Sequence, residues 1–233
     1  MSTTEPKRRT IKSFVRRTGR ITPSQEKALD ELWPVYGIDY APEPLALDDV
    51  FGRHAERVLE IGFGNGETLV ELARAHPERD YLGVDVYEPG IGRLLAAASQ
   101  LGLANLRVLR GDAAEVLGAS FPAQSLAEIL VLFPDPWPKK RHHKRRLVQA
   151  AFVERVADCL APGGILHLAT DWEGYAEHML SVLEAEPLLE NVAGAGNYYS
   201  GVEVRPVTKF ERRGARLGNV IRDLRFRRRP ACT

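Results

Sequence analysis

Short apolar runs alternate with helical segments from residue 57 onward, and this alternation restricts the fold more than any other feature of the chain. The runs suited to strands cover residues 58–61, 81–86, 106–109, 129–133 and 165–169, and the helical segments cover residues 67–76, 90–101, 145–160 and 175–186. Strands that are apolar throughout need cover on both faces, as in parallel sheets with helical crossovers. The pattern therefore predicts a doubly wound, mostly parallel, seven-stranded α/β sheet with helices on both faces. Residues 192–193 and 220–226 would add the last strands, the latter as a half-exposed edge.

The first 50 residues lack this alternation. Residues 1–22 read as a basic, poorly patterned arm, residues 24–32 as a short helix that stops before Pro34, and residues 37–50 as a connector. We therefore expect an arm and connector over residues 1–50, followed by one α/β domain over residues 51–233.

The composition of the chain limits which cellular compartment and which kinds of metal or disulfide site we expect. No run approaches the roughly 20 apolar residues of a membrane span, and the N-terminus has no apolar signal-peptide core. Two cysteines, Cys159 and Cys232, provide neither a disulfide framework nor a metal-ligand cluster. We expect a cytoplasmic protein with no metal, and the Arg-rich N-terminus leaves mitochondrial targeting as an alternative.

Basic residues are segregated along the chain, although the formal net charge is only +1. Residues 1–20, 139–146 and 205–229 contain seven, six and ten basic residues, but only one, none and two acidic ones. The rest of the chain is strongly acidic. Such segregation is the footprint of a protein that binds a polyanion on one face, which favours a nucleic-acid partner.

A glycine-rich turn follows the first strand of the domain, where Gly62, Gly64 and Gly66 are spaced G-x-G-x-G. A dinucleotide fingerprint needs G-x-G-x-x-G, and Glu67 occupies the place of its third glycine. A carboxylate there would oppose a pyrophosphate, which disfavours a nicotinamide dehydrogenase. Glu60, just before the turn, suits an ammonium group instead.

Two further acids stand at the ends of the next strands. Asp85 can accept hydrogen bonds from ribose hydroxyls, and Asp112 lies where an adenine amino group would be, although a helix N-cap is the alternative for Asp112. With Glu60 and the glycine turn, this set resembles the class I S-adenosylmethionine-dependent methyltransferases, which have a Rossmann-like fold.

The fourth strand leads into Phe133-Pro134-Asp135-Pro136-Trp137-Pro138, in which prolines restrict the backbone around Asp135 and Trp137. Such a loop could hold a carboxylate and an aromatic surface against a flat acceptor; the alternative is a rigid connector with Trp137 in the core. The strings FPDPWPKKRHHKRR, ATDW and RPVTKFERRG resemble the tRNA (guanine-N-7)-methyltransferases from about residue 57 to residue 229, and SFVRRTGRIT of residues 13–22 fits that family's arm.

This resemblance implies a function and a role for each matching residue. The chain would methylate the variable-loop guanosine at position 46 of tRNA, using S-adenosyl-L-methionine. The cofactor-binding residues would be Glu60, Gly62, Gly64, Asp85, Asp112 and Asp135. Asp135 would be the active-site residue, and substrate contacts would come from Lys139, Asp171, Thr208, Lys209, Phe210 and Glu211. The RNA contacts would come from Arg141, His142, His143, Lys144, Arg145 and Arg146.

The acceptor indicates the mechanism, because guanine N-7 carries an in-plane lone pair and no proton. No general base is needed, so we expect Asp135 to position the acceptor and stabilise its charge. Relatives in bacteria work alone, and nothing in the sequence requires a protein partner. The alternatives are a class I methyltransferase for another RNA, a protein or a small molecule, and a non-catalytic RNA-binding protein.

Overall fold

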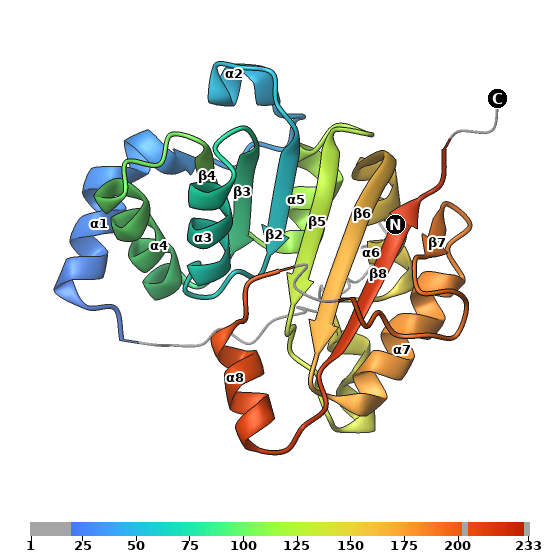
Figure 1. The fold of residues 1–233 in the computed structure, drawn as a ribbon. Coiled ribbons are helices and arrows are strands. Elements are labelled where there is room, and N and C mark those ends of the chain that lie inside the picture. Colours follow the sequence, from blue (N-terminus) through green and yellow to red (C-terminus); the bar gives the residue numbers. More distant parts are fainter. Residues whose placement is uncertain (1–19, 202–204, 231–233) are drawn as a thin grey trace, which may run out of the picture.

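The computed structural model describes residues 20–201 and 205–230, so most of the basic arm lies outside the described residues. Within these ranges the centre is one eight-stranded sheet with the order β1-β4-β3-β2-β5-β6-β8-β7 (Figure 1). The strands are β1 (Gly37–Ile38), β2 (Arg57–Ile61), β3 (Asp80–Asp85), β4 (Leu106–Arg110), β5 (Leu126–Leu132), β6 (Leu160–Thr170), β7 (Leu189–Asn191) and β8 (Arg222–Arg228). The pairs from β1 to β6 are parallel, and β8 is antiparallel to β6 and β7.

Helices cover both faces of this sheet. They are α1 (Pro23–Tyr36), α2 (Leu47–Phe51), α3 (Glu67–Ala75), α4 (Glu88–Gln100), α5 (Ala113–Ser120), the 3-10 helix η1 (Lys140–Arg145), α6 (Ala150–Cys159), α7 (Glu173–Glu184) and α8 (Lys209–Arg216). One apolar core packs α1, α3 and α4 against β2, β3 and β4, and the other packs α5, α6 and α7 against the opposite face. The predicted doubly wound, mostly parallel α/β fold is confirmed. No helix of the described residues is long and apolar enough to cross a membrane.

The N-terminal part contains more regular structure than its composition indicated. The helix α1 runs through Pro34 to Tyr36, and β1 and α2 lie in the segment expected to be a connector. Thr22 caps α1 in a capping box with Gln25, and Trp33 packs on the core beneath the helix while its indole donates to Asp39. Because these tertiary contacts hold the C-terminal turn, Pro34 does not end the helix.

The C-terminal half differs from the expectation in two further ways. The strand expected over residues 192–193 lies at residues 189–191 as β7 and pairs with β8, so β8 is an interior strand and not an edge. The strand beyond the predicted seven is β1, which pairs with β4. The alternation in β8 is real, since Leu224 and Phe226 are buried on one face. The helix expected over residues 145–160 begins only at Ala150, as α6, and residue 145 is the last residue of η1. Val148 is buried between the two helices, and its N–H donates to the Tyr175 hydroxyl.

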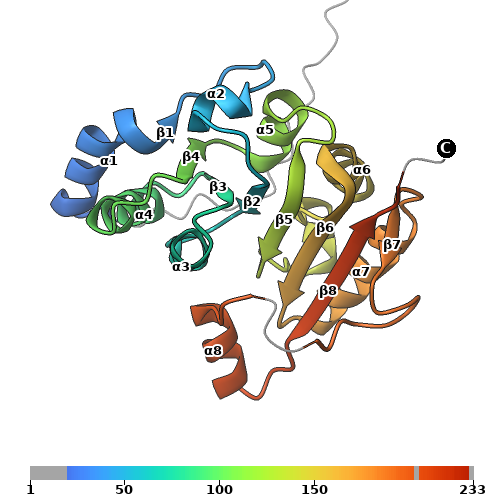
Figure 2. The same cartoon turned by 45° about the horizontal axis from the view of Figure 1, so that its top comes forward.

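The order of the strands brings the candidate site together. The sheet grows in one direction from β2 through β3 and β4, and in the other from β2 to β5 and β6. The carboxyl ends of these five parallel strands meet at one edge, and ligands bind at such a switch point in open α/β sheets. The helix α8 stands below this edge, in front of the ends of β5, β6 and β8 (Figure 2).

Candidate active site

The glycine turn after β2 leaves open space beside the backbone. Gly62 and Gly64 have φ of 73° and 60°, and a Cβ built on either would meet no atom within 4 Å. Gly90 lies against the other side of this turn, where only a glycine fits, because a Cβ built at this position would come within 1.8 Å of the Gly64 carbonyl oxygen. The amino end of α4 therefore packs directly on the turn, a role for Gly90 that sequence analysis did not identify.

Glu60 carries a buried carboxyl group beside this glycine turn. The residue is 3% exposed, and its Oε2 atom has no hydrogen-bond partner among the described residues. Burial and the nearby charge of Asp85 raise the pKa of Glu60 to about 8. A carboxylate here is costly unless a cation pairs with it, so the position fits a ligand that carries an ammonium group.

Asp85 and Asp112 both bind backbone N–H groups. The Asp85 carboxylate accepts from Gly64 at 2.8 Å, from Val86 at 2.7 Å and from Tyr87 at 2.9 Å, and therefore ties the glycine turn to the end of β3. Asp112 caps α5, with Oδ1 accepting from Ala114 N–H at 3.0 Å. The alternative interpretation of Asp112 as an N-cap is confirmed, and the cofactor roles of both acids stay predictions.

Asp135 lies in a loop with an unusual backbone. Phe133 and Trp137, on either side of it, have φ of 54° and 46°, in the left-handed region that residues other than glycine rarely adopt. Such conformations cost of order 1–3 kcal/mol each and persist where the surroundings enforce them, often at functional sites. The loop is held by Arg146, whose Nε donates to the Pro136 carbonyl at 3.0 Å.

The position of Arg146 corrects one predicted role. Arg146 is 4% exposed; its Nη1 also donates to the Gly174 carbonyl at 3.1 Å, and its guanidinium lies over the Tyr175 ring at 4.8 Å. A buried guanidinium with these partners is not available to RNA phosphates, so its role is to hold the Asp135 loop.

The rest of the predicted basic run is accessible. Lys139, Arg141, Lys144 and Arg145 are exposed, and His142 and His143 are partly buried. Trp137 is not part of the apolar core: the Arg145 guanidinium lies over its ring at 5.0 Å, and His142 contacts it edge-on at 5.8 Å.

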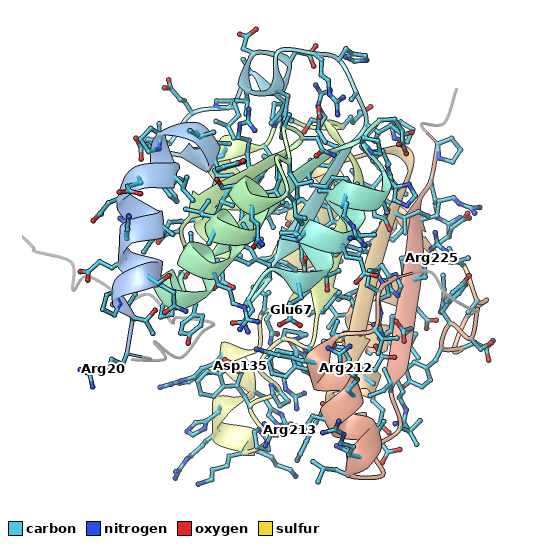
Figure 3. The ribbon with its side chains drawn as sticks, turned by 60° about the vertical axis from the view of Figure 1, so that its left-hand side comes forward. Arg20, Glu67, Asp135, Arg212, Arg213 and Arg225 are labelled. Atoms are coloured by element: carbon cyan, nitrogen blue, oxygen red, sulfur yellow. The ribbon has the colours of Figure 1, made fainter. Side chains whose placement is uncertain are left out.

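The helix α8 carries the predicted guanosine-site segment. Thr208 is its N-cap and accepts from Glu211 N–H at 3.1 Å, while Phe210 stacks on Phe133 with 6.2 Å between the ring centroids. Arg212 reaches Glu67 of α3 at 3.8 Å, and this link places α8 across from the glycine turn. Figure 3 shows Glu67, Asp135 and Arg212 in the same lower part of the view.

Asp171 joins this group from the end of β6. Its Oδ2 accepts from Asn219 Nδ2 at 3.0 Å, and a Cβ on Gly214 would come within 3.1 Å of the same oxygen. The structure therefore places the predicted substrate residues Asp171, Thr208, Lys209, Phe210 and Glu211 in one region, although they come from separate parts of the sequence.

One residue with a buried side chain supports this region without any sign of that role in the sequence. Arg205 opens the string RPVTKFERRG and lies in a basic segment, but no site role was predicted for it; its side chain is 6% exposed and binds Asp223 and Glu211. In a run of arginines nothing in the sequence distinguishes a buried member from solvated ones.

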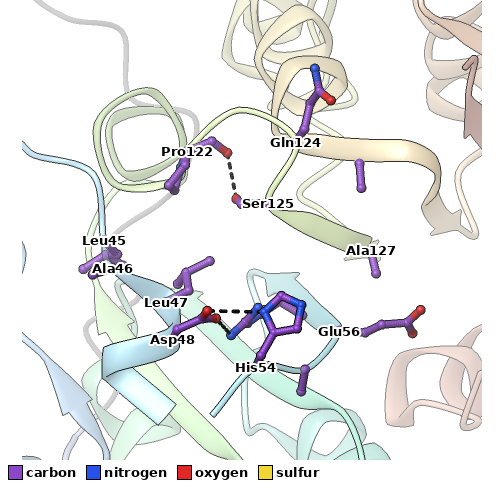
Figure 4. A pocket seen from close by; sticks show the side chains of 13 residues that line it. Leu45, Ala46, Leu47, Asp48, His54, Glu56, Pro122, Gln124, Ser125 and Ala127 are labelled. Atoms are coloured by element: carbon purple, nitrogen blue, oxygen red, sulfur yellow. Dashed lines mark hydrogen bonds and ion pairs between the residues drawn. The ribbon is translucent and has the colours of Figure 1, made fainter. Parts of the chain in front are cut away.

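A cavity of about 710 Å³ lies away from these residues (Figure 4). Its lining includes Asp48, His54, Arg57, Gln124 and Ser125, around the amino ends of β2 and β5. None of the predicted site residues lines it, and the candidate site lies at the opposite, carboxyl edge of the sheet.

Comparison with known proteins identifies the family of the chain. Residues 54–224 match the family model described as "Putative methyltransferase". Of the solved structures, the 16S rRNA methyltransferase KamB has a TM-score of 0.57 at 19% identity, over 79% of this chain and 93% of that one. A 16S rRNA (adenine(1408)-N(1))-methyltransferase from Catenulisporales acidiphilia, solved with its cosubstrate SAM, has a TM-score of 0.51 at 18% identity over 78% and 90%. At these identities the likeness establishes the fold alone.

Curated relatives are much more similar. The chain is 58% identical over 224 residues to the tRNA (guanine-N(7)-)-methyltransferase of Alkalilimnicola ehrlichii, covering 95% of this chain and 94% of that protein. It is 56% identical over 219 residues to the protein of the same name from Leifsonia xyli subsp. xyli, covering 94% and 96%. The chain therefore belongs to the tRNA (guanine-N(7)-)-methyltransferase family.

Proposed function

We propose that this protein transfers the methyl group of S-adenosyl-L-methionine to N-7 of a guanine in tRNA, at the variable-loop position 46. The observation that carries the proposal is the buried carboxyl of Glu60, whose Oε2 atom has no hydrogen-bond partner within the described part of the chain. It lies beside an open glycine turn, at the same sheet edge as Asp135 and α8. The Glu60 carboxyl beside the turn suits a ligand with an ammonium group. The Asp135 loop together with α8 suits a nucleobase acceptor.

The residues around the turn would hold the cofactor, which when bound supplies an electrophilic methyl group on sulfur. Glu60 would pair with the ammonium of its methionine part, and the backbone of Gly62 and Gly64 would border it without side-chain interference. Asp85 and Asp112, at the ends of β3 and β4, would accept from the ribose and the adenine.

Asp135 would act by position and charge. The guanine N-7 atom attacks with its own lone pair, so no proton needs to leave the acceptor before the methyl group arrives. Orienting two reactants can contribute roughly 7–11 kcal/mol, and the constrained loop suits that purpose. A fixed carboxylate would also stabilise the positive charge that appears on the purine. Asp135 could in addition contact the cofactor.

The guanosine would lie between this loop and α8. Lys139, Asp171 and the segment Thr208 to Glu211 would contact it, and the exposed cations Arg141, Lys144 and Arg145, with His142 and His143, would contact the tRNA backbone. In this proposal residues 51–233 form the methyltransferase domain, and residues 1–50 add a basic arm and connector. The protein would act on tRNA in the cytoplasm without a metal or a protein partner.

Incubation with methyl-labelled cofactor and unmodified tRNA, followed by nucleoside analysis, tests the proposal. We expect label in 7-methylguanosine alone, and none in a matched tRNA with adenosine at position 46. Label in a different nucleoside would contradict the N-7 assignment. Equal labelling of both tRNAs would contradict the variable-loop position.

A further inference from the structure

We propose that Arg205 is a positioning residue that fixes the guanosine-site helix α8 against the Asp135 loop, with Asp223 and His167 as its anchor on the sheet. The inference rests on the proposed function, because it assigns Arg205 a role in placing that site. It concerns three residues to which none of the site roles above is assigned.

Arg205 joins three separate elements through one guanidinium. Its Nε and Nη2 donate to the two carboxylate oxygens of Asp223 on β8, at 2.9 and 3.1 Å. Its Nη1 donates to Glu211 Oε2 on α8 at 2.5 Å. The same group lies 5.6 Å from the ring of Phe133, the residue that starts the Asp135 loop and stacks on Phe210.

The anchor of this contact is rigid. Asp223 pairs with Ala169 in the β6–β8 ladder, and its Oδ1 is 2.7 Å from Nε2 of His167, which is 1% exposed. Burial alone would raise the pKa of Asp223, but its hydrogen bonds with His167 and Arg205 outweigh burial and lower it. Burial likewise opposes the charge of Arg205, yet its bonds to Asp223 and Glu211 raise its pKa. Both groups therefore stay ionised.

Stability alone is a poor explanation for such a cluster. Replacing a buried ion pair by well-packed apolar residues is often neutral or stabilising, because taking charges out of water is costly. An arginine fork instead fixes direction, since its planar donors match two carboxylates at once, which a lysine cannot do. Here the fixed element is the carboxylate of Glu211, within the segment that would contact the guanosine.

The Arg205→Lys variant keeps the charge and removes the fork, and Arg227→Lys is its matched control. Arg227 is an exposed arginine of the same strand as Asp223, paired with Glu190 at 3.6 Å. We expect Arg205→Lys to lower kcat with tRNA by about tenfold or more, because small misplacements of a reactant are costly in rate. Cofactor affinity should stay within about twofold of wild type, and the control should resemble wild type.

Two further measurements separate positioning from general damage. If Arg205 acts through Glu211, the double variant Arg205→Lys/Glu211→Gln should be no slower than Glu211→Gln alone. Amide hydrogen exchange of the free protein should speed up in α8 and stay unchanged in α3. If Arg205→Lys folds poorly, Asp223→Asn, which keeps the side-chain shape, should show the same exchange pattern with a smaller rate loss.

The inference is overturned if Arg205→Lys keeps full activity or if hydrogen exchange in α8 is unchanged. It is also overturned if the rate losses of the two single variants multiply in the double variant. The exchange result depends on Arg205 and not on the substrate. A wild-type protein that labels a different nucleoside would therefore refute the proposed function while leaving this test of Arg205 intact.

Discussion

At the scale of one residue, the Glu60 carboxyl shows how burial changes the pKa of an acid. Local sequence places it before the glycine turn, but only the packing around β2 buries it and brings Asp85 near, which together raise its pKa to about 8. At neutral pH the ligand-free protein therefore holds a proton on Glu60. A bound ammonium would favour the ionised form and displace that proton.

We predict that cofactor binding at pH 7 releases a proton and tightens as the pH rises toward 8. The bound state, with an ionised Glu60, holds fewer protons than the free state, so raising the pH favours binding. Calorimetry in two buffers of different ionisation enthalpy should give different heats. The difference should vanish in Glu60→Gln and persist in Glu115→Gln, an exposed carboxylate on α5. Equal heats for the wild type would refute the role of Glu60.

At the scale of elements, the separation of η1 from α6 depends on contacts that lie far apart in the sequence. The composition of residues 145–160 favours one helix, yet Arg146 turns inward to bind the carbonyls of Pro136 and Gly174. The chain between η1 and α6 is thereby used to hold the Asp135 loop. A basic side chain in a basic run gives no local sign of this role.

The variant Arg146→Met should lower the free energy of unfolding by about 2 kcal/mol, because two carbonyls in partly buried hydrogen bonds lose a charged donor. Urea unfolding followed by circular dichroism measures the change. Lys144→Met, an exposed neighbour, is the control and should stay within about 0.5 kcal/mol of wild type. An equally small effect of Arg146→Met would show that the loop does not depend on this residue.

At the scale of the whole molecule, the parallel sheet gathers residues from distant segments at one edge. Glu60 and Asp85 lie at the carboxyl ends of β2 and β3, and Asp112 follows β4. Asp135 and Asp171 follow β5 and β6, on the other side of the switch point. The exposed cations of η1 adjoin the same edge, so an RNA bound across them would reach the Asp135 loop.

Replacing Arg141 and Arg145 together by Gln should weaken binding of all tRNAs alike. The slope of log affinity against log salt concentration should fall by nearly 0.9 for each duplex-like phosphate contact that is lost. Filter binding at several salt concentrations measures this slope. Arg74 and Arg155, exposed on α3 and α6, provide the control pair, whose replacement should leave the slope unchanged. An unchanged slope in the first variant would mean that η1 is merely solvated.

The sequence by itself determined the strand and helix alternation, the glycine turn and the acids at the strand ends. These features are local: each depends on a few neighbouring residues and on the rule that parallel strands end at one edge. The tertiary structure alone decided that α1 passes through Pro34, that β8 is interior, and that Arg146 and Arg205 are buried. The physical reason is that the fate of a proline or an arginine depends on its packing partners, and long-range packing supplies the Asp223 and Glu211 carboxylates that keep Arg205 charged inside the protein.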